Sequence, residues 1–220
     1  LLLTLIMTIA PAIAFSQTSL PYSDNFTGED DKGNIGGTED VSEVDWSINT
    51  TDATLEGGDV FGVQSEVFEV TDIDGDAIWT SKTIDISGES SLDFSIYAGA
   101  DGDFEASSDL FKIEIIVDEG TPETLFEGIV DESKTGDPMF FGSTKLTNTL
   151  QTFTKSVSVS GSNAEIKITS NNNVGTELYR FDNLSLSKAT TKPEPADHAT
   201  SFTATANGPT QIDLTWNDAT

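Results

Sequence analysis

The chain has 220 residues, enough for one domain with a buried core and part of a second. It carries 10 lysines and arginines against 38 aspartates and glutamates, a formal net charge of −28. This charge repels nucleic acids and anionic membrane surfaces, so neither is an expected partner. The chain has no cysteine, which excludes disulfides, thiolate metal sites and a lipid-modified cysteine.

Residues 1–16 form an uncharged apolar run that ends in small residues. The run is shorter than the ~20 residues needed to span a bilayer and resembles the apolar region of a secretory signal peptide, with Ala12 and Ala14, or Ala14 and Ser16, at the cleavage site. No methionine or basic segment precedes it, so we expect a signal that is truncated at its start. The alternative is a buried core strand. The signal predicts a secreted or cell-surface protein that leaves the membrane once the signal is removed.

Short runs of alternating apolar residues, separated by turns rich in Gly, Asn, Asp and Ser, fill residues 20–90. Alternation with period two is typical of a strand with one buried face. The expected elements are, in order, a strand at 20–27 that ends at Phe26, a long polar loop at 28–45, a strand from Trp46, a possibly bulged strand at 60–70, a turn at 71–76 and one or two strands at 78–86.

The stretch Ser91–Thr121 is the centre of the predicted domain. Two runs alternate apolar and polar residues, at 92–97 and 111–117, and we expect them to form a strand pair with one apolar face. The loop between them contains four acids, Asp101, Asp103, Glu105 and Asp109. The remaining strands are expected to cover the same apolar face.

The rest of the main domain continues the same pattern. We expect a hairpin partner at 124–130, a loop at 131–142, and strands around 153–159, 166–168 and 178–186. No segment has the apolar spacing of a sustained amphipathic helix. The fold class is therefore all-β, an antiparallel β-sandwich of jelly-roll type with about eight to ten strands at 17–188.

A second domain begins near the end of the chain. Residues 189–196 include two prolines and no large apolar residue, which indicates an extended linker. Residues 197–220 hold two short alternating runs, with Trp216 on the second. They resemble the first two strands of a fibronectin type III domain, which implies an incomplete second β-sandwich and further domains in the same protein.

The main domain lacks the residues of common catalytic sites. The single histidine, His198, lies beyond it, no cysteine is present to act as a nucleophile, and no glycine-rich phosphate loop occurs. Carboxylates are so numerous that no particular pair stands out as glycosidase acids. We therefore expect a non-catalytic segment, with activity elsewhere in the full protein an open question.

One short motif predicts a cation site. Asp72, Asp74 and Asp76 alternate around Gly75, and such carboxylates can supply the oxygen ligands that Ca2+ prefers. The spacing departs from that of an EF-hand, and an ordinary acidic turn is the alternative. The stretch Asp101–Glu105 is a second candidate of the same kind.

Four short motifs, at 22–26 (YSDNF), 79–87 (WTSKTIDIS), 109–120 (DLFKIEIIVDEG) and 179–187 (YRFDNLSLS), are similar to those of secreted Bacteroidetes-type jelly-roll modules. These modules share their layout with carbohydrate-binding modules and with MAM- or laminin-G-like sandwiches. The resemblance implies glycan binding and a structural calcium that joins the first strand to the last. In this chain it implies Asp182 as a ligand with Asp24 as its partner. A strand-edge acid bonded to backbone is the alternative for Asp182.

Glycan binding needs exposed rings that stack on sugar faces beside polar groups. The available rings are Trp46, Trp79, Tyr97, Phe104, Phe140, Phe141 and Tyr179. Most are expected in the core, and the candidates for a ligand site are Tyr97, Phe104 and Trp46, with Phe104 the ring expected to be most exposed. An exposed ring beside polar groups would favour glycan binding. Burial of all seven rings would favour a structural or adhesive spacer without a small ligand. A third alternative is an accessory domain of an enzyme encoded beyond residue 220.

Overall fold

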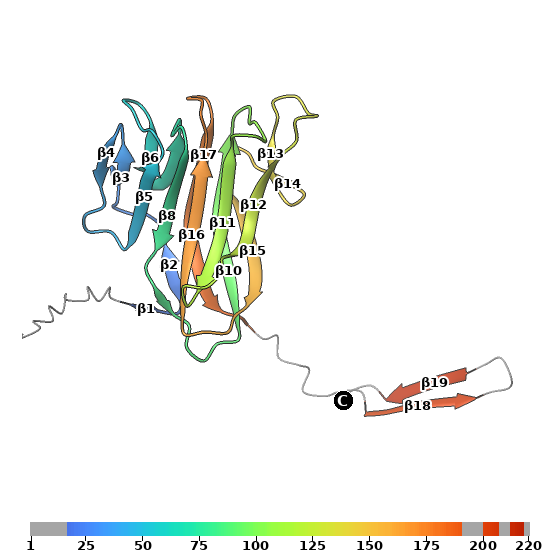
Figure 1. Cartoon of the computed structure of the whole chain (residues 1–220). Coiled ribbons are helices and arrows are strands. Elements are labelled where there is room, and N and C mark those ends of the chain that lie inside the picture. Colours follow the sequence, from blue (N-terminus) through green and yellow to red (C-terminus); the bar gives the residue numbers. More distant parts are fainter. Residues whose placement is uncertain (1–16, 191–199, 207–211, 218–220) are drawn as a thin grey trace, which may run out of the picture. The chain divides into compact units, whose positions relative to one another are not determined.

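The computed structural model describes residues 17–190, 200–206 and 212–217, and the chain divides into two compact units between Ala189 and Thr190. The predicted signal peptide at 1–16 and most of the predicted linker lie outside the described residues. Figure 1 labels the strands of both units.

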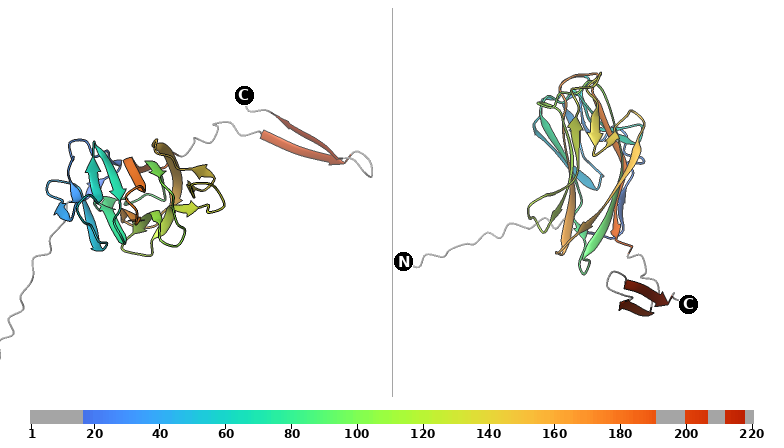
Figure 2. Two further views of the ribbon diagram at one scale, coloured as in Figure 1. Left: turned by 90° about the horizontal axis from the view of Figure 1, so that it is seen from above. Right: turned by 90° about the vertical axis from the view of Figure 1, so that its right-hand side faces the viewer.

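The first unit consists of two sheets packed face to face, which Figure 2 shows edge-on. The 9-stranded sheet contains β1 (Thr18–Ser19), β5 (Trp46–Asp52), β8 (Asp76–Ser81), β9 (Ile84–Asp85), β11 (Leu110–Val117), β12 (Glu123–Val130), β13 (Met139–Phe141), β14 (Thr144–Lys145) and β16 (Asn163–Asn171). The 8-stranded sheet contains β2 (Tyr22–Asp24), β3 (Gly33–Ile35), β4 (Thr38–Asp40), β6 (Val60–Gln64), β7 (Val67–Thr71), β10 (Ser91–Asp101), β15 (Gln151–Ser158) and β17 (Leu178–Lys188). Apart from the parallel contact of β1 with β9, the pairs are antiparallel, so the predicted all-β sandwich is confirmed.

The core forms where the apolar faces of the two sheets meet. Alternation along β10 and β11 sends every second side chain inward, and the rings of Phe68 and Phe181 stack with centroids 4.6 Å apart. Trp79 packs edge-on against Phe181 from the other sheet, at 5.8 Å. Burying one such large apolar side chain contributes about 1.5–3 kcal/mol. The core therefore fixes the positions from which the loops at the ends of the strands project.

The predicted pairing of the two central strands is wrong. β10 pairs with β15 and β17, whereas β11 pairs with β16 and β12 in the other sheet. The acidic loop at 102–109 therefore crosses from one sheet to the other. Both runs do have one apolar face, but these faces meet across the core instead of forming one surface, because alternation specifies which face is buried and not which strand lies alongside.

Three further predictions are corrected. The polar loop expected at 28–45 contains the hairpin of β3 and β4. The bulged strand expected at 60–70 is a hairpin of β6 and β7, turned by Ser65 and Glu66 with φ of 53° and 61°. The loop expected at 131–142 ends in β13, so the unit has more strands than predicted. The hairpin of β11 with β12 is confirmed.

The second unit is described as one antiparallel pair, β18 (Thr200–Ala206) with β19 (Ile212–Asn217). The expectation of two strands is confirmed, and the start of a fibronectin type III domain stays a prediction. Across the described residues of both units there is no helix, and hence none long and apolar enough to cross a membrane.

Candidate functional site

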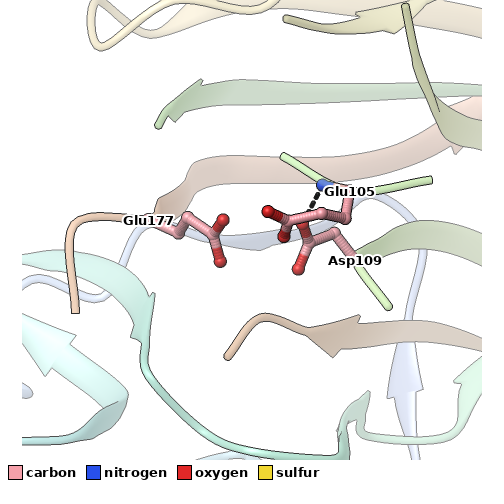
Figure 3. Close-up of side chains that lie close together, drawn as sticks. All are labelled: Glu105, Asp109 and Glu177. Atoms are coloured by element: carbon pink, nitrogen blue, oxygen red, sulfur yellow. Dashed lines mark hydrogen bonds between the residues drawn. The ribbon is translucent and has the colours of Figure 1, made fainter. Parts of the chain in front are cut away.

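Three carboxylates from two loops meet at one end of the sandwich. Glu105 and Asp109 belong to the crossing loop between β10 and β11, and Glu177 directly precedes β17. One oxygen of each carboxylate lies within 4.8 Å of the other two. Figure 3 shows the Glu177 carboxylate pointing toward the other two across a small gap. We call these three residues the acidic triad.

Local hydrogen bonds fix the first two members of the triad. The Asp109 amide donates to the Glu105 carbonyl at 2.9 Å, as in one turn of a helix. The Glu105 amide donates in return to Oδ2 of Asp109. This reciprocal pair holds both side chains on the same side of the loop.

A buried asparagine holds the backbone of Glu177, the third member of the triad. Asn172 is fully buried, and its Nδ2 donates to the carbonyls of Val70 and Glu177, both at 3.1 Å. The Glu177 amide donates to the Val174 carbonyl at 2.8 Å, and Oε2 of Glu177 accepts from the Asn173 amide at 3.3 Å. The backbone of Glu177 is thus tied to the 8-stranded sheet through Val70.

The triad is buried without a compensating positive charge. Glu177 is 1% exposed and Asp109 8%, while Glu105 is exposed. Oε1 of Glu177 and Oδ1 of Asp109 are buried and have no hydrogen-bond partner among the described residues. None of the ion pairs in the described part of the chain includes a triad member. Two buried acceptors therefore point into a space that the described residues leave without a donor.

Burial shifts the titration of these groups. It raises the pKa of Glu177 to about 7, and the neighbouring Asp109 carboxylate adds to the shift. Burial raises the pKa of Asp109 as well. The pKa of Tyr179 is also raised, chiefly by burial and then by the Asp109 and Glu177 charges. Each shift reflects the cost of placing negative charge where water is excluded.

The predicted calcium turn at 72–76 is held by asparagines. The amides of Ile73 and Asp74 donate to the Asn172 carbonyl at 3.1 Å, and Asn171 Nδ2 donates to Asp76 Oδ1 at 3.0 Å. Ile73 is fully buried and anchors the turn. Asp72, Asp74 and Asp76 do not belong to the three-carboxylate group found among the described residues, and their role as calcium ligands stays a prediction.

Asp24 and Asp182 lie on the paired strands β2 and β17, with Asp24 opposite Leu184, and neither belongs to the three-carboxylate group found among the described residues. Asp24 accepts from the Phe26 amide at 3.1 Å, and its pKa is raised to about 6 by burial, with Glu29 and Asp45 adding to the shift. Asp182 lies on β17 and accepts hydrogen bonds from the backbone and side chain of Asn183. Its pKa is raised by burial and by the Glu66 charge. The two carboxylates thus have different acidic neighbours.

Of the three rings predicted to bind a ligand, the structure exposes Tyr97 alone. Tyr97 is 40% exposed, whereas Trp46 is 5% and Phe104 2% exposed. The expectation that Phe104 is exposed is wrong, because its ring stacks on Tyr179 with centroids 5.3 Å apart. Trp46 packs against the core ring of Phe68, and its Nε1 donates to Glu29 Oε2 at 2.7 Å. Acidic neighbours in sequence therefore did not indicate an exposed ring.

Tyr97 stands on a polar sheet face. It lies opposite Thr152 of β15 and Asp182 of β17. Two residues earlier, Ser95 lies opposite Thr154 and Ser185. Directly opposite residues on antiparallel strands have Cβ atoms about 4.5–5.5 Å apart, so hydroxyl and carboxylate groups flank the ring on both sides.

A separate hollow of about 430 Å³ lies beside β12 and β13. Ile129, which is 59% exposed, and the half-buried Phe140 supply its apolar wall. Asp131, Glu132 and Lys134 supply its polar wall. The loop between β10 and β11, which carries Glu105 and Asp109, also lines this hollow through Ala106. The Ala106 amide donates to Glu132 Oε1 at 3.1 Å.

Part of the triad is predictable from the sequence. Glu105 and Asp109 stand among the acids of the crossing loop, and Glu105 belongs to a predicted cation stretch. Glu177 was missed because it lies 68 positions beyond Asp109 (177 − 109) in a stretch without an acidic motif. Only the folding of both loops to the same end of the sandwich brings it near.

No known protein-family profile matches the chain, and no curated protein matches its sequence. Solved structures with similarity include the carbohydrate recognition domain of Emp47p, at 10% identity and a TM-score of 0.46, covering 77% of this chain and 96% of that one. The module CBM4 has 16% identity and a TM-score of 0.41, with coverage of 68% and 92%. The C-terminal family 22 carbohydrate-binding module of Clostridium thermocellum Xyn10B has 15% identity and a TM-score of 0.40, with coverage of 77% and 94%. Similarities at this level assign neither a family nor a ligand to the chain.

Proposed function

We propose that the unit ending at Ala189 is a non-catalytic carbohydrate-binding module of a secreted or cell-surface protein that has further domains. The observation that carries this proposal is the exposed ring of Tyr97 on a polar sheet face. An exposed ring beside polar groups is the feature that separates glycan binding from a spacer role.

The chemistry around Tyr97 suits a sugar ring. An aromatic face offers a flat apolar surface to the C–H groups of a pyranose, and flanking hydroxyl and carboxylate groups exchange hydrogen bonds with its hydroxyls. Thr152 and Asp182 hold those positions on the two neighbouring strands. β10 and β17, which carry Tyr97 and Asp182, each pair with strands on both sides, and β15 with Thr152 forms the edge of the sheet beside them.

A basic group extends this surface. Arg180 lies opposite Gly99, two residues along β10 from Tyr97. Its guanidinium donates to the Asn148 carbonyl at 2.7 Å and lies 3.9 Å from Glu69 Oε1. An arginine held in this way keeps its remaining N–H groups in fixed directions. It thus adds donors to a face that otherwise offers acceptors and hydroxyls.

The test is binding of the full chain to a panel of soluble plant and microbial polysaccharides, measured by affinity electrophoresis. We expect retardation by at least one polysaccharide, lost in Tyr97→Ala and retained in Tyr97→Phe, because stacking needs the ring and not its hydroxyl. Phe140→Ala is the matched control, since it removes a ring from the hollow beside β12 and β13 and leaves the Tyr97 face intact.

Two outcomes would contradict the proposal. Absence of retardation by every polysaccharide would favour a structural or adhesive spacer. Retardation that survives Tyr97→Ala and disappears in Phe140→Ala would move glycan binding to the hollow beside β12 and overturn the role given to the Tyr97 face.

A further inference from the structure

We propose that the acidic triad of Glu105, Asp109 and Glu177 is a calcium-binding site that ties the β10–β11 loop to the start of β17. The site shares Glu105 with the predicted cation stretch at 101–105, adds Asp109 and Glu177, and goes beyond glycan binding. It would hold whether or not the Tyr97 face binds a sugar.

The observation that points to a ligand is the pair of orphaned acceptor atoms. Glu177 is 1% exposed and Asp109 8%, yet Oε1 of the first and Oδ1 of the second are buried without a partner among the described residues. A buried carboxylate oxygen without a donor is costly, and such groups are normally paired or bound to a metal. In the close-up the Glu177 carboxylate points toward those of Glu105 and Asp109 (Figure 3), and one oxygen of each lies within 4.8 Å of the other two.

The spacing suits a single ion. Calcium holds its oxygen ligands at about 2.3–2.6 Å, so two oxygens bound to the same ion lie at most about 5 Å apart. The three triad oxygens lie within 4.8 Å of one another. One ion placed between them lies at most about 2.8 Å from each oxygen, so small side-chain rotations bring all three carboxylates into its ligand range.

The donor set selects the kind of metal. All three ligands are carboxylates, which suit hard cations, whereas zinc and copper sites favour nitrogen or sulfur. Calcium accepts six to eight oxygens in flexible geometry, and three carboxylates with one exposed member, Glu105, leave room for water to complete the shell. Magnesium demands near-ideal octahedral geometry and keeps more of its water, so it fits a half-buried triad less well.

A shared proton is the competing explanation. Two buried carboxyl groups can satisfy each other when one is protonated and donates to the other. That arrangement needs no metal, and Asp109 can share its proton with either Glu105 or Glu177. Calcium needs the three carboxylates charged, so saturable calcium binding at about pH 8 separates the two explanations.

The frame around the triad is rigid enough to act as a site. Glu177 is held through Asn172, and a side chain on Gly102 would place its Cβ 2.9 Å from Glu177 Cγ. The ring of Tyr179, two residues beyond Glu177, is stacked between Phe104 and Phe111 at 5.3 and 5.0 Å. Both loops are thus anchored to the same aromatic stack, and an ion would join two segments that are already in place.

The test is calorimetric titration of CaCl2 into the full chain, stripped with EDTA, at about pH 8 and about 0.15 M NaCl to screen the acidic surface. We expect one saturable site per chain, with MgCl2 binding at least about tenfold more weakly. Glu177→Gln, Asp109→Asn and Glu105→Gln should each weaken calcium binding at least about tenfold, because each removes a charged ligand. Asp182→Asn and Asp74→Asn are the matched controls and should leave it unchanged.

Circular dichroism of each variant checks that it folds, and Glu105→Gln keeps the test decisive because Glu105 is exposed. No saturable binding in the wild type would overturn the proposal. Unchanged calcium affinity in Glu105→Gln would also contradict it, because the ion would then not be held by all three carboxylates. Loss of binding in Asp182→Asn or Asp74→Asn, with Glu177→Gln unaffected, would move the site to the turn or strand that the sequence predicted.

Discussion

The domain buries carboxylates in two ways. Glu114 on β11 is 6% exposed and has two lysines within reach, Lys112 Nζ at 2.7 Å and Lys167 Nζ at 3.4 Å. Glu177 is buried even more fully, at 1% exposed, and its nearest charged neighbours are the carboxylates of Asp109 and Glu105. Lysines of the same chain thus neutralise the buried Glu114, whereas the buried Glu177 is surrounded by other carboxylates.

The titration of the two sites follows from this difference. Burial acts to raise the pKa of Glu114, but Lys112 and Lys167 outweigh it and the net shift is downward. At Glu177 burial and the Asp109 charge act in the same direction, and the pKa rises to about 7. Burial alone therefore does not decide the charge state of a carboxylate. What decides it is whether a cation is held beside it, and at the triad that cation has to come from solution.

Removing the internal cations should have the largest effect. In the double variant Lys112→Met/Lys167→Met, Glu114 becomes a buried charge without a partner, and we expect the free energy of unfolding to fall by about 3–5 kcal/mol. Urea unfolding with calcium and with EDTA measures this, and the loss should be the same in both. The control is Lys134→Met, which breaks the exposed pair with Asp131 and should cost at most about 1 kcal/mol. A loss no larger than that of the control would mean that Glu114 needs no partner.

The pH dependence of stability should show a smaller effect at Glu177. Its folded-state pKa of about 7 exceeds its ordinary value, so the folded state holds this proton more tightly than the unfolded state. Stability from this group is fully present below about pH 4.3 and is lost as the pH rises through about 7 in the absence of calcium.

The measurement is the difference in unfolding free energy between wild type and Glu177→Gln, followed from about pH 4.5 to 8 in EDTA. The subtraction removes the contribution of the many other carboxylates. We expect the free energy of unfolding of the variant to increase relative to that of the wild type as the pH rises. A difference that stays flat across this range would contradict the assignment of a raised pKa to Glu177.

Much of the fold could be predicted from alternation and turn residues. The runs at 92–97 and 111–117 were recognised as strands with one apolar face, and both are. Their pairing was predicted wrongly because period two contains no information about neighbours, and a loop of eight residues can close a hairpin or cross between sheets. The hairpin of β3 and β4 was missed because it contributes little to the core and so lacks apolar alternation.

The candidate sites show the same limit. Tyr97 is exposed while Phe94 and Ile96 are buried, because alternation places it on the other face of β10. Phe104 was expected at the surface from its acidic neighbours, yet its ring fills the space beneath them. Glu177 could not be predicted to lie beside Asp109, because the contact depends on how the two sheets stack. Alternation within one strand can predict which side chains are exposed. It cannot predict which residues of separate loops lie together, because that depends on the tertiary structure.

The most direct measurement for the whole account is the thermal unfolding midpoint of wild type and Glu177→Gln at about pH 8, each in EDTA and in calcium. If the triad is a buried charge cluster that an external cation neutralises, the variant is more stable than wild type in EDTA, because one repelling charge is gone. Calcium then raises the wild-type midpoint by several degrees and leaves that of the variant almost unchanged. The difference between the two midpoints therefore becomes smaller or changes sign. A variant that is less stable than wild type in EDTA, or an equal calcium shift in both proteins, would contradict the account.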